Sequence, residues 1–175
     1  MKTRNGFVSN SSSSSFILAL PGRPTSAKQM HEWMFPDGPI TICPYDFVGA
    51  LSSERAADIA YEDLKDATAL TRDEIVDELD SGSFCAPAPK GIKFPKYPDY
   101  YTRKGLTDAE EDALYEKYGK ETRAVAEKLA DHLICESPKA FFFRVSYSDG
   151  NGSVGTNMEH GDVFRNLPHR QTSHH

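Results

Sequence analysis

Histidine and carboxylate side chains gather near the C-terminal end of the chain, which holds four of its six histidines. Imidazole nitrogens and carboxylate oxygens bind zinc and other divalent transition metals, and three such ligands leave a position for water. The candidate metal ligands are His160, His169, His174, His175, Glu159 and Asp162. Their spacing matches no named metal motif. In the alternative interpretation, these histidines cap helices, donate to carbonyl oxygens or lie in solvent.

A second pair of chemically active side chains, His132 and Cys135, is three residues apart in an expected helix. Residues at this spacing are neighbours on a helix surface, so the pair could supply two metal ligands or a Cys–His nucleophile. Leu129 and Leu133 place the core on the same side. The pattern therefore favours a buried cysteine beside a histidine with satisfied hydrogen bonds.

A run of serines follows Asn10 near the N-terminus. Its hydroxyl groups could bind an anion, contact a partner, be modified or act as a nucleophile beside a histidine. The residues concerned are Asn10, Ser11, Ser12, Ser13, Ser14 and Ser15. Serine tracts are usually flexible linkers, but apolar residues flank this one on both sides, which favours an ordered segment.

Cations alternate with aromatic side chains between residues 90 and 104, as in a groove that binds single-stranded nucleic acid. The candidate contacts are Lys90, Lys93, Lys96, Tyr97, Tyr100 and Tyr101. The chain as a whole has 20 basic and 26 acidic residues, a net charge of −6. That acidity favours the alternative, a proline-rich loop whose tyrosines pack inward or against another subunit.

Composition indicates one compact domain over residues 1–175, with 38% hydrophobic and 26% charged residues. No apolar stretch approaches the roughly 20 residues that a membrane span requires. Three widely spaced cysteines favour a reducing compartment, and the short apolar run at residues 16–20 is not a secretory signal. The chain contains no P-loop, dinucleotide fingerprint, nucleophile elbow or EF-hand motif.

Hydrophobic periodicity and capping residues predict an α+β fold. Helices are expected at residues 26–35, from Ser52 or Ser53 to about Leu70, at 71–82 and at 107–135, with capping boxes at the last two. A buried strand is expected at 16–20, and a hairpin at 141–156 with its turn at 149–152. A proline-rich surface loop occupies about 83–105. The expected architecture is a small antiparallel sheet, made of the N-terminal strand and the C-terminal hairpin, covered by three or four helices.

The two ends of the chain resemble small uncharacterised proteins of tailed bacteriophages and prophages. The resemblance lies in residues 4–16, which read RNGFVSNSSSSSF, and in the segment from Glu159-His160-Gly161 through Leu167-Pro168-His169 to the final Ser-His-His. It implies a phage or prophage origin and a location in the bacterial host cytoplasm or the virion. It implies no activity and no catalytic residues.

These observations favour a phage-type accessory or virion-associated protein that binds protein, either itself or another phage or host protein, without catalysis. The alternative is a small metal-dependent hydrolase that uses the C-terminal histidines and carboxylates with zinc or another divalent metal. A binder of single-stranded nucleic acid is the weaker alternative. The residues leave open whether the protein is an enzyme.

Overall fold

The computed structural model describes residues 13–85 and 88–174, and for His174 only the backbone. The described part of the chain has an α+β fold with a four-stranded and a two-stranded antiparallel sheet. The elements in chain order are β1 (Ser13–Leu20), α1 (Ala27–Met34), β2 (Thr41–Ile42), β3 (Leu51–Ser52), α2 (Ser53–Leu64), α3 (Arg72–Asp80), β4 (Ser83–Phe84), α4 (Tyr100–Arg103), α5 (Asp108–Glu136), β5 (Phe141–Ser148), the 3-10 turn η1 (Asp149–Asn151), α6 (Gly152–His160) and β6 (His169–His174).

The main sheet has the strand order β4-β6-β1-β5, so its first strand lies between the last two. Phe16 of β1 is opposite Val145 on one side and Gln171 on the other. Seven consecutive residues of β1, from Ser14 to Leu20, are buried. The predicted strand at 16–20 is confirmed, and it extends back into the serine tract.

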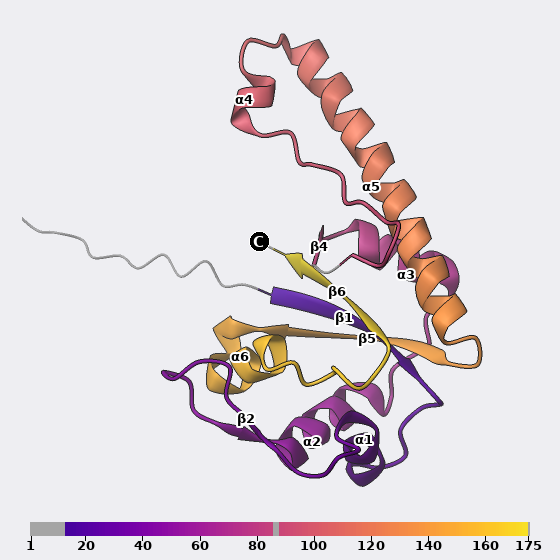
Figure 1. The fold of residues 1–175 in the computed structure, drawn as a ribbon, viewed down its shortest axis with the longest axis vertical. Helices are drawn as coiled ribbons and strands as arrows, with labels where there is room; N and C mark the ends of the chain where they lie inside the picture. The colour runs from indigo at the N-terminus through magenta and orange to yellow at the C-terminus, as the bar shows by residue number, and fades with distance from the viewer. Residues whose placement is uncertain (1–12, 86–87, 175) are drawn as a thin grey trace, which may run out of the picture.

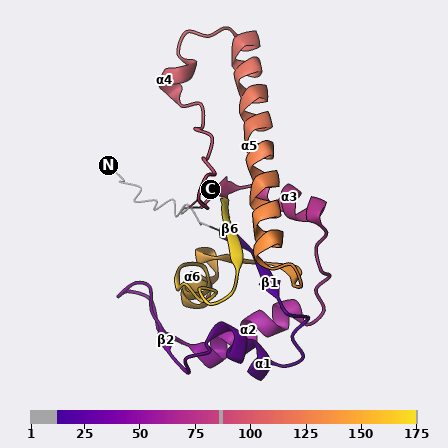
Figure 2. The same ribbon diagram turned by 45° about the vertical axis from the view of Figure 1, so that its right-hand side comes forward.

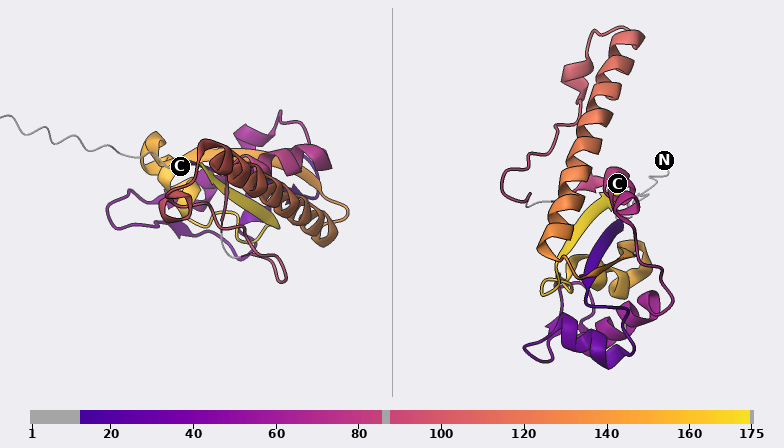
Figure 3. Two further views of the ribbon diagram at one scale, coloured as in Figure 1. Left: turned by 90° about the horizontal axis from the view of Figure 1, so that it is seen from above. Right: turned by 90° about the vertical axis from the view of Figure 1, so that its right-hand side faces the viewer.

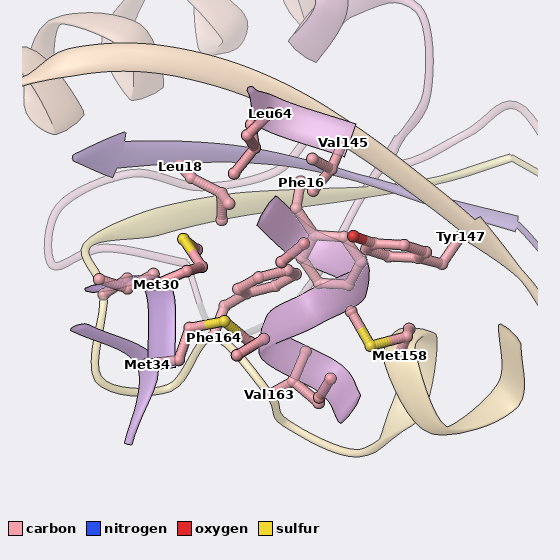
Figure 4. Packing of buried hydrophobic residues seen from close by; sticks show 14 of the residues in the cluster. Phe16, Leu18, Met30, Met34, Leu64, Val145, Tyr147, Met158, Val163 and Phe164 are labelled. Atoms are coloured by element: carbon pink, nitrogen blue, oxygen red, sulfur yellow. The ribbon is translucent and has the colours of Figure 1, made fainter. Parts of the chain in front are cut away.

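One face of the sheet packs against α1, α2 and α6 (Figure 1). Phe16 and Phe164 meet there with ring centroids 5.2 Å apart, and Met30 and Met158 fill the space between the helices (Figure 4). Each fully buried side chain of this size stabilises the fold by about 1.5–3 kcal/mol. This core fixes α6 and the chain that follows it against the sheet.

The other face of the sheet packs against α3 and the C-terminal half of α5. Ile17 of β1 lies among Ile75 of α3 and Leu133 of α5, all 1% exposed or less. The Arg72 guanidinium also joins the two helices, because it donates to both carboxylate oxygens of Asp131 at 2.7 and 3.1 Å. Both faces of the sheet are therefore covered.

Local capping signals predicted the helix starts well. Ser26, Ser52, Thr71 and Thr107 cap α1, α2, α3 and α5, and the last two form complete capping boxes. Helix α2 ends at Leu64, about six residues earlier than expected. The loop at 83–105 contains the short strand β4, which pairs with β6, and the one-turn helix α4.

The predicted return arm of the C-terminal hairpin is wrong. Residues 153–156 lie in α6, and β1 pairs instead with β6, for which no strand was expected. Gly152 has a φ of 71°, which lets the chain leave η1 and enter a helix rather than fold back as a strand. Residues 155–159 of that helix are buried between the sheet and the loop that joins β2 to β3, whose Gly49 carbonyl accepts from the Asn157 amide.

The N-terminal half of α5 stands away from the rest of the molecule together with α4 and its flanking loop (Figures 2 and 3). Residues 96–122 are called the arm here. No residue of α5 before Val125 is buried, so its first 17 residues, about 26 Å of helix, lie outside both cores. No described helix is both long and apolar enough to cross a membrane.

Candidate functional site

Four of the predicted metal ligands line one polar pocket of about 220 Å³. Glu159 and His160 come from the end of α6, Asp162 from the turn that follows, and His169 from the start of β6. The turn brings them to the same face of the sheet, and Phe16 of β1 closes the inner side. The fold thus brings together residues that the sequence separates by as many as ten positions.

Glu159 is buried, and both its carboxylate oxygens already have partners. The Ser14 hydroxyl donates to Oε1 at 3.0 Å, and the Asp149 backbone N–H donates to Oε2 at 2.9 Å. His160 Nε2 lies 3.6 Å from the same Oε2. The carboxylate therefore ties the start of β1 to the end of β5, which is a structural role.

The histidines of the pocket are held by the fold as well. The His169 Nδ1 lies 2.8 Å from the Leu167 carbonyl oxygen, which can only accept, so Nδ1 donates. The His160 ring packs at 5.6 Å against the ring of Tyr45. Asp162 is exposed and has a φ of 52°. The polar groups of His160, Asp162 and His169 that line the pocket could form hydrogen bonds with a small polar molecule.

Within the part of the chain that the structure describes, no three His, Cys, Asp or Glu side chains converge in a way that could hold a metal ion. For His174, the structure gives a backbone pairing with Ser13 and no side chain, and His175 lies outside the described residues. The metal centre stays a prediction from the sequence.

The serine tract is divided by the start of β1. Ser13, Ser14 and Ser15 are paired with both β5 and β6, while Asn10, Ser11 and Ser12 lie outside the described residues. The Ser14 hydroxyl reaches Glu159, and the Ser15 and Ser146 hydroxyls are 2.9 Å apart on the other face. The described serines therefore have local hydrogen-bond partners, as an ordered tract requires.

The expected buried cysteine beside His132 is wrong, because Cys135 is exposed. His132 instead lies in an ionic group at the edge of the sheet. The Arg170 guanidinium donates at 2.9 Å to His132 Nδ1 and at 2.6 Å to Glu136 Oε2. These contacts join β6 to α5, and they direct His132 away from any nucleophilic pairing with the cysteine.

The candidate nucleic-acid residues lie on the arm and at its base. Lys90 and Lys93 precede the arm, whereas Lys96, Tyr97, Tyr100 and Tyr101 are part of it. The loop is held against α5 by Tyr97, whose ring centroid is 5.4 Å from that of Tyr118 and 6.2 Å from that of Tyr115. A hydrogen bond to Tyr97 and partial desolvation raise the pKa of Tyr115.

The outward surface of the arm carries aromatic side chains without a cover. Tyr101 is 84% exposed, Tyr100 64% and Tyr97 57%. Tyr100 and Tyr101 pack edge to face, with centroids 5.7 Å apart. At the inner side, Arg103 donates to Glu111 at 2.9 Å and lies over the Tyr115 ring. The arm thus offers large exposed rings on a support that is fixed by its own contacts.

Charge on the arm is mixed rather than basic. Lys96 lies 3.7 Å from Asp99, and the hydrogen bond to Glu111 raises the pKa of Arg103. Four of the first five residues of α5, next to the tyrosines, are carboxylates. Phosphate groups would be repelled at this end of α5.

Two further surface features had no counterpart in the sequence predictions. An apolar groove of about 500 Å³ lies at the end of β1, where Leu20, Trp33, Pro138 and Pro168 line it among other residues. Phe47, 86% exposed, stacks on Tyr45 in the loop between β2 and β3. The chain segments that line the groove are far apart in the sequence, so no local pattern could have indicated it.

Comparison with protein-family models, with curated proteins and with solved structures finds no match to this chain. Its function must therefore be inferred from its own geometry.

Proposed function

We propose that this protein acts by binding protein, in a phage particle or an infected bacterium, and that the arm is its binding surface. The observation that carries the proposal is the exposure of three tyrosines on a segment that adds nothing buried to either core. Tyrosine and arginine are enriched in protein interfaces, and tyrosine supplies a large contact area at low entropic cost. The resemblance of the chain ends to phage proteins supports the setting.

Aromatic exposure alone does not distinguish the arm from the body, because Phe47 is as exposed as Tyr101. The difference is that the arm also stands clear of the fold and is ordered by its own contacts, so a partner can reach it from several sides. The polar pocket supports binding of a small molecule less well, because its buried carboxylate is already satisfied.

Site-specific photo-crosslinking tests the proposal. A photoreactive phenylalanine analogue replaces Tyr101 in one variant and Phe47 in the other, and both are irradiated in extracts of phage-infected bacteria. The two positions have nearly equal exposure, 84% and 86%, so chance collisions should label them equally. We expect discrete protein adducts at position 101 that are absent at position 47.

Equal labelling at the two positions, or no protein adduct at position 101, would overturn the proposal. An adduct at position 101 that nuclease treatment removes would also overturn it, and would indicate nucleic acid as the ligand. Circular dichroism of each variant shows whether the arm keeps its helix.

A further inference from the structure

The two sides of the arm carry opposite charge. The loop side has Lys96, Arg103 and Lys104 against the carboxylate of Asp99, which lies 3.7 Å from Lys96, whereas four of the first five residues of α5 are carboxylates. Across one arm, Arg103 and Glu111 form an ion pair at 2.9 Å. In contrast to this ion pair, the side chains of Lys104, Asp108 and Asp112 are exposed to solvent.

Such a surface is complementary to itself. In a two-fold contact the same patch meets its own copy, so a basic side must face an acidic side for both halves to attract. When two arms lie antiparallel, the loop of each comes over the start of α5 in the other. The exposed rings of Tyr100 and Tyr101 then lie near the centre, with charged groups around them, which is the usual anatomy of an interface.

The size of the arm allows a weak dimer. Residues 96–122 number 27 and only part of them can face a partner, which is fewer than the about 20–30 residues on each side of a stable interface of ordinary size. The arm also extends from the end of the molecule opposite to α1 and α2, so two bodies would stay apart when the arms overlap (Figures 1 and 2).

Resting on the proposed function, we infer that the partner of the arm is a second copy of this chain, and that two arms pair antiparallel about a two-fold axis. The aromatic rings supply the buried centre, and the reciprocal contact of Lys96 and Lys104 with Asp108 and Asp112 sets the register.

Charge-swap variants test this pairing in the purified full-length protein. The loop variant carries Lys96→Glu and Lys104→Glu, and the helix variant carries Asp108→Lys and Asp112→Lys. All four side chains are exposed, and the capping box of Thr107 and Glu110 is left intact. Sedimentation velocity over a wide concentration range measures the dimer dissociation constant of each protein.

The wild type should show a monomer–dimer equilibrium that weakens as salt is raised. Each charge-swap variant alone should dissociate at least about tenfold more readily, because like charges then face each other twice. An equimolar mixture of the two variants should form a heterodimer about as stable as the wild-type dimer, since both contacts are again opposite in sign. One chain carrying all four substitutions should likewise recover its homodimer.

The control is Lys28→Glu on α1, whose side chain is 87% exposed at the opposite end of the molecule. It changes the net charge in the same direction as the loop variant and should leave the dimer unchanged. Circular dichroism verifies that the helix variant keeps α5, and recovery in the mixture excludes misfolding as the cause of its loss.

A wild type that stays monomeric up to about 0.5 mM would overturn the inference. A dimer that both charge-swap variants preserve would overturn it too, as would a mixture that fails to recover. Protein adducts at position 101 in extracts, together with a monomeric purified chain, would leave the proposed function standing and remove only the self-pairing. Absence of adducts in extracts together with a monomeric chain would remove both.

Discussion

Truncation of two leucines on the same helix tests whether the arm is separate from the core. Leu133 of α5 is fully buried against α3 and the sheet, whereas Leu114 lies half-buried in the arm. Leu133→Ala removes buried methyl groups and leaves a cavity, which costs about 2.7–5 kcal/mol of unfolding free energy. For a chain of this size that corresponds to a fall in Tm of roughly 5–20 °C.

Leu114→Ala should cost less than about 1 kcal/mol, because the side chain is partly solvated and alanine is the better helix former. The measurement is urea unfolding followed by the fluorescence of Trp33, the single tryptophan, which lies in α1 of the body. The chain is kept at two dilute concentrations so that association does not contribute. Equal losses of stability for the two variants would show that the arm belongs to the cooperative core, and would refute the separation on which the proposed binding role depends.

Four further perturbations have outcomes that follow from the structure. Gly119→Ala should stabilise the N-terminal half of α5 by about 0.5–1 kcal/mol, because an added Cβ meets open space in a helix, and amide hydrogen exchange of residues 108–122 should slow accordingly. Gly155→Ala should lower the unfolding free energy in the urea titration, because the Cβ would overlap a backbone carbonyl at the end of β5. Burial and the Asp63 carboxylate raise the pKa of Tyr147 well above its usual value, so the folded state holds a proton that the unfolded state loses near pH 10. Stability should therefore fall from about pH 9 to pH 11, and urea midpoints should show a smaller fall for Tyr147→Phe. Burial, followed by the charge of Glu159, raises the pKa of the Cys85 thiol, so Cys85 should react with a thiol reagent more slowly than the two exposed cysteines, as peptide mapping of a time course would show.

Features that depend on neighbouring residues in the sequence were predictable. The capping boxes at Thr71 and Thr107 involve side chains three positions apart, and the helices start where those boxes place them. The burial of β1 follows from its apolar run. Each of these features depends on residues that are only a few positions apart, so the local sequence is enough to predict it.

Features that depend on distant pairing were missed. Strand β6 reads HRQTSH and contains no apolar residue, so its strand form comes from pairing with β1 rather than from its own propensity. The turn chemistry at residues 149–152 indicated a hairpin. The chain continues as a helix after this turn because Met158 and Glu159 are buried against the sheet. That burial depends on residues far away in the sequence, so a local pattern could not predict it.

The same limit explains why the arm was not foreseen. Leu114 and Tyr118 continue the spacing of Leu129 and Leu133, so the apolar face of α5 looks uniform along its length. The C-terminal part of that face is covered by the sheet, and the N-terminal part by a loop rich in proline and tyrosine. Periodicity reports that a face is apolar and not what covers it.

Much of the rest of the described surface is already occupied, apart from the apolar groove at the end of β1 and the exposed ring of Phe47. Both faces of the main sheet are covered by helices, and the buried carboxylate of the polar pocket joins Ser14 of β1 to the Asp149 backbone of η1. At the edge of the sheet, the Arg170 guanidinium donates to His132 and to Glu136. The arm differs because its helix would be marginal in isolation, while the Tyr97 contacts that order its loop leave the rings of Tyr100 and Tyr101 64% and 84% exposed. A segment that is ordered without being buried gains most from a partner, because the entropic cost of arranging its contact surface has already been met.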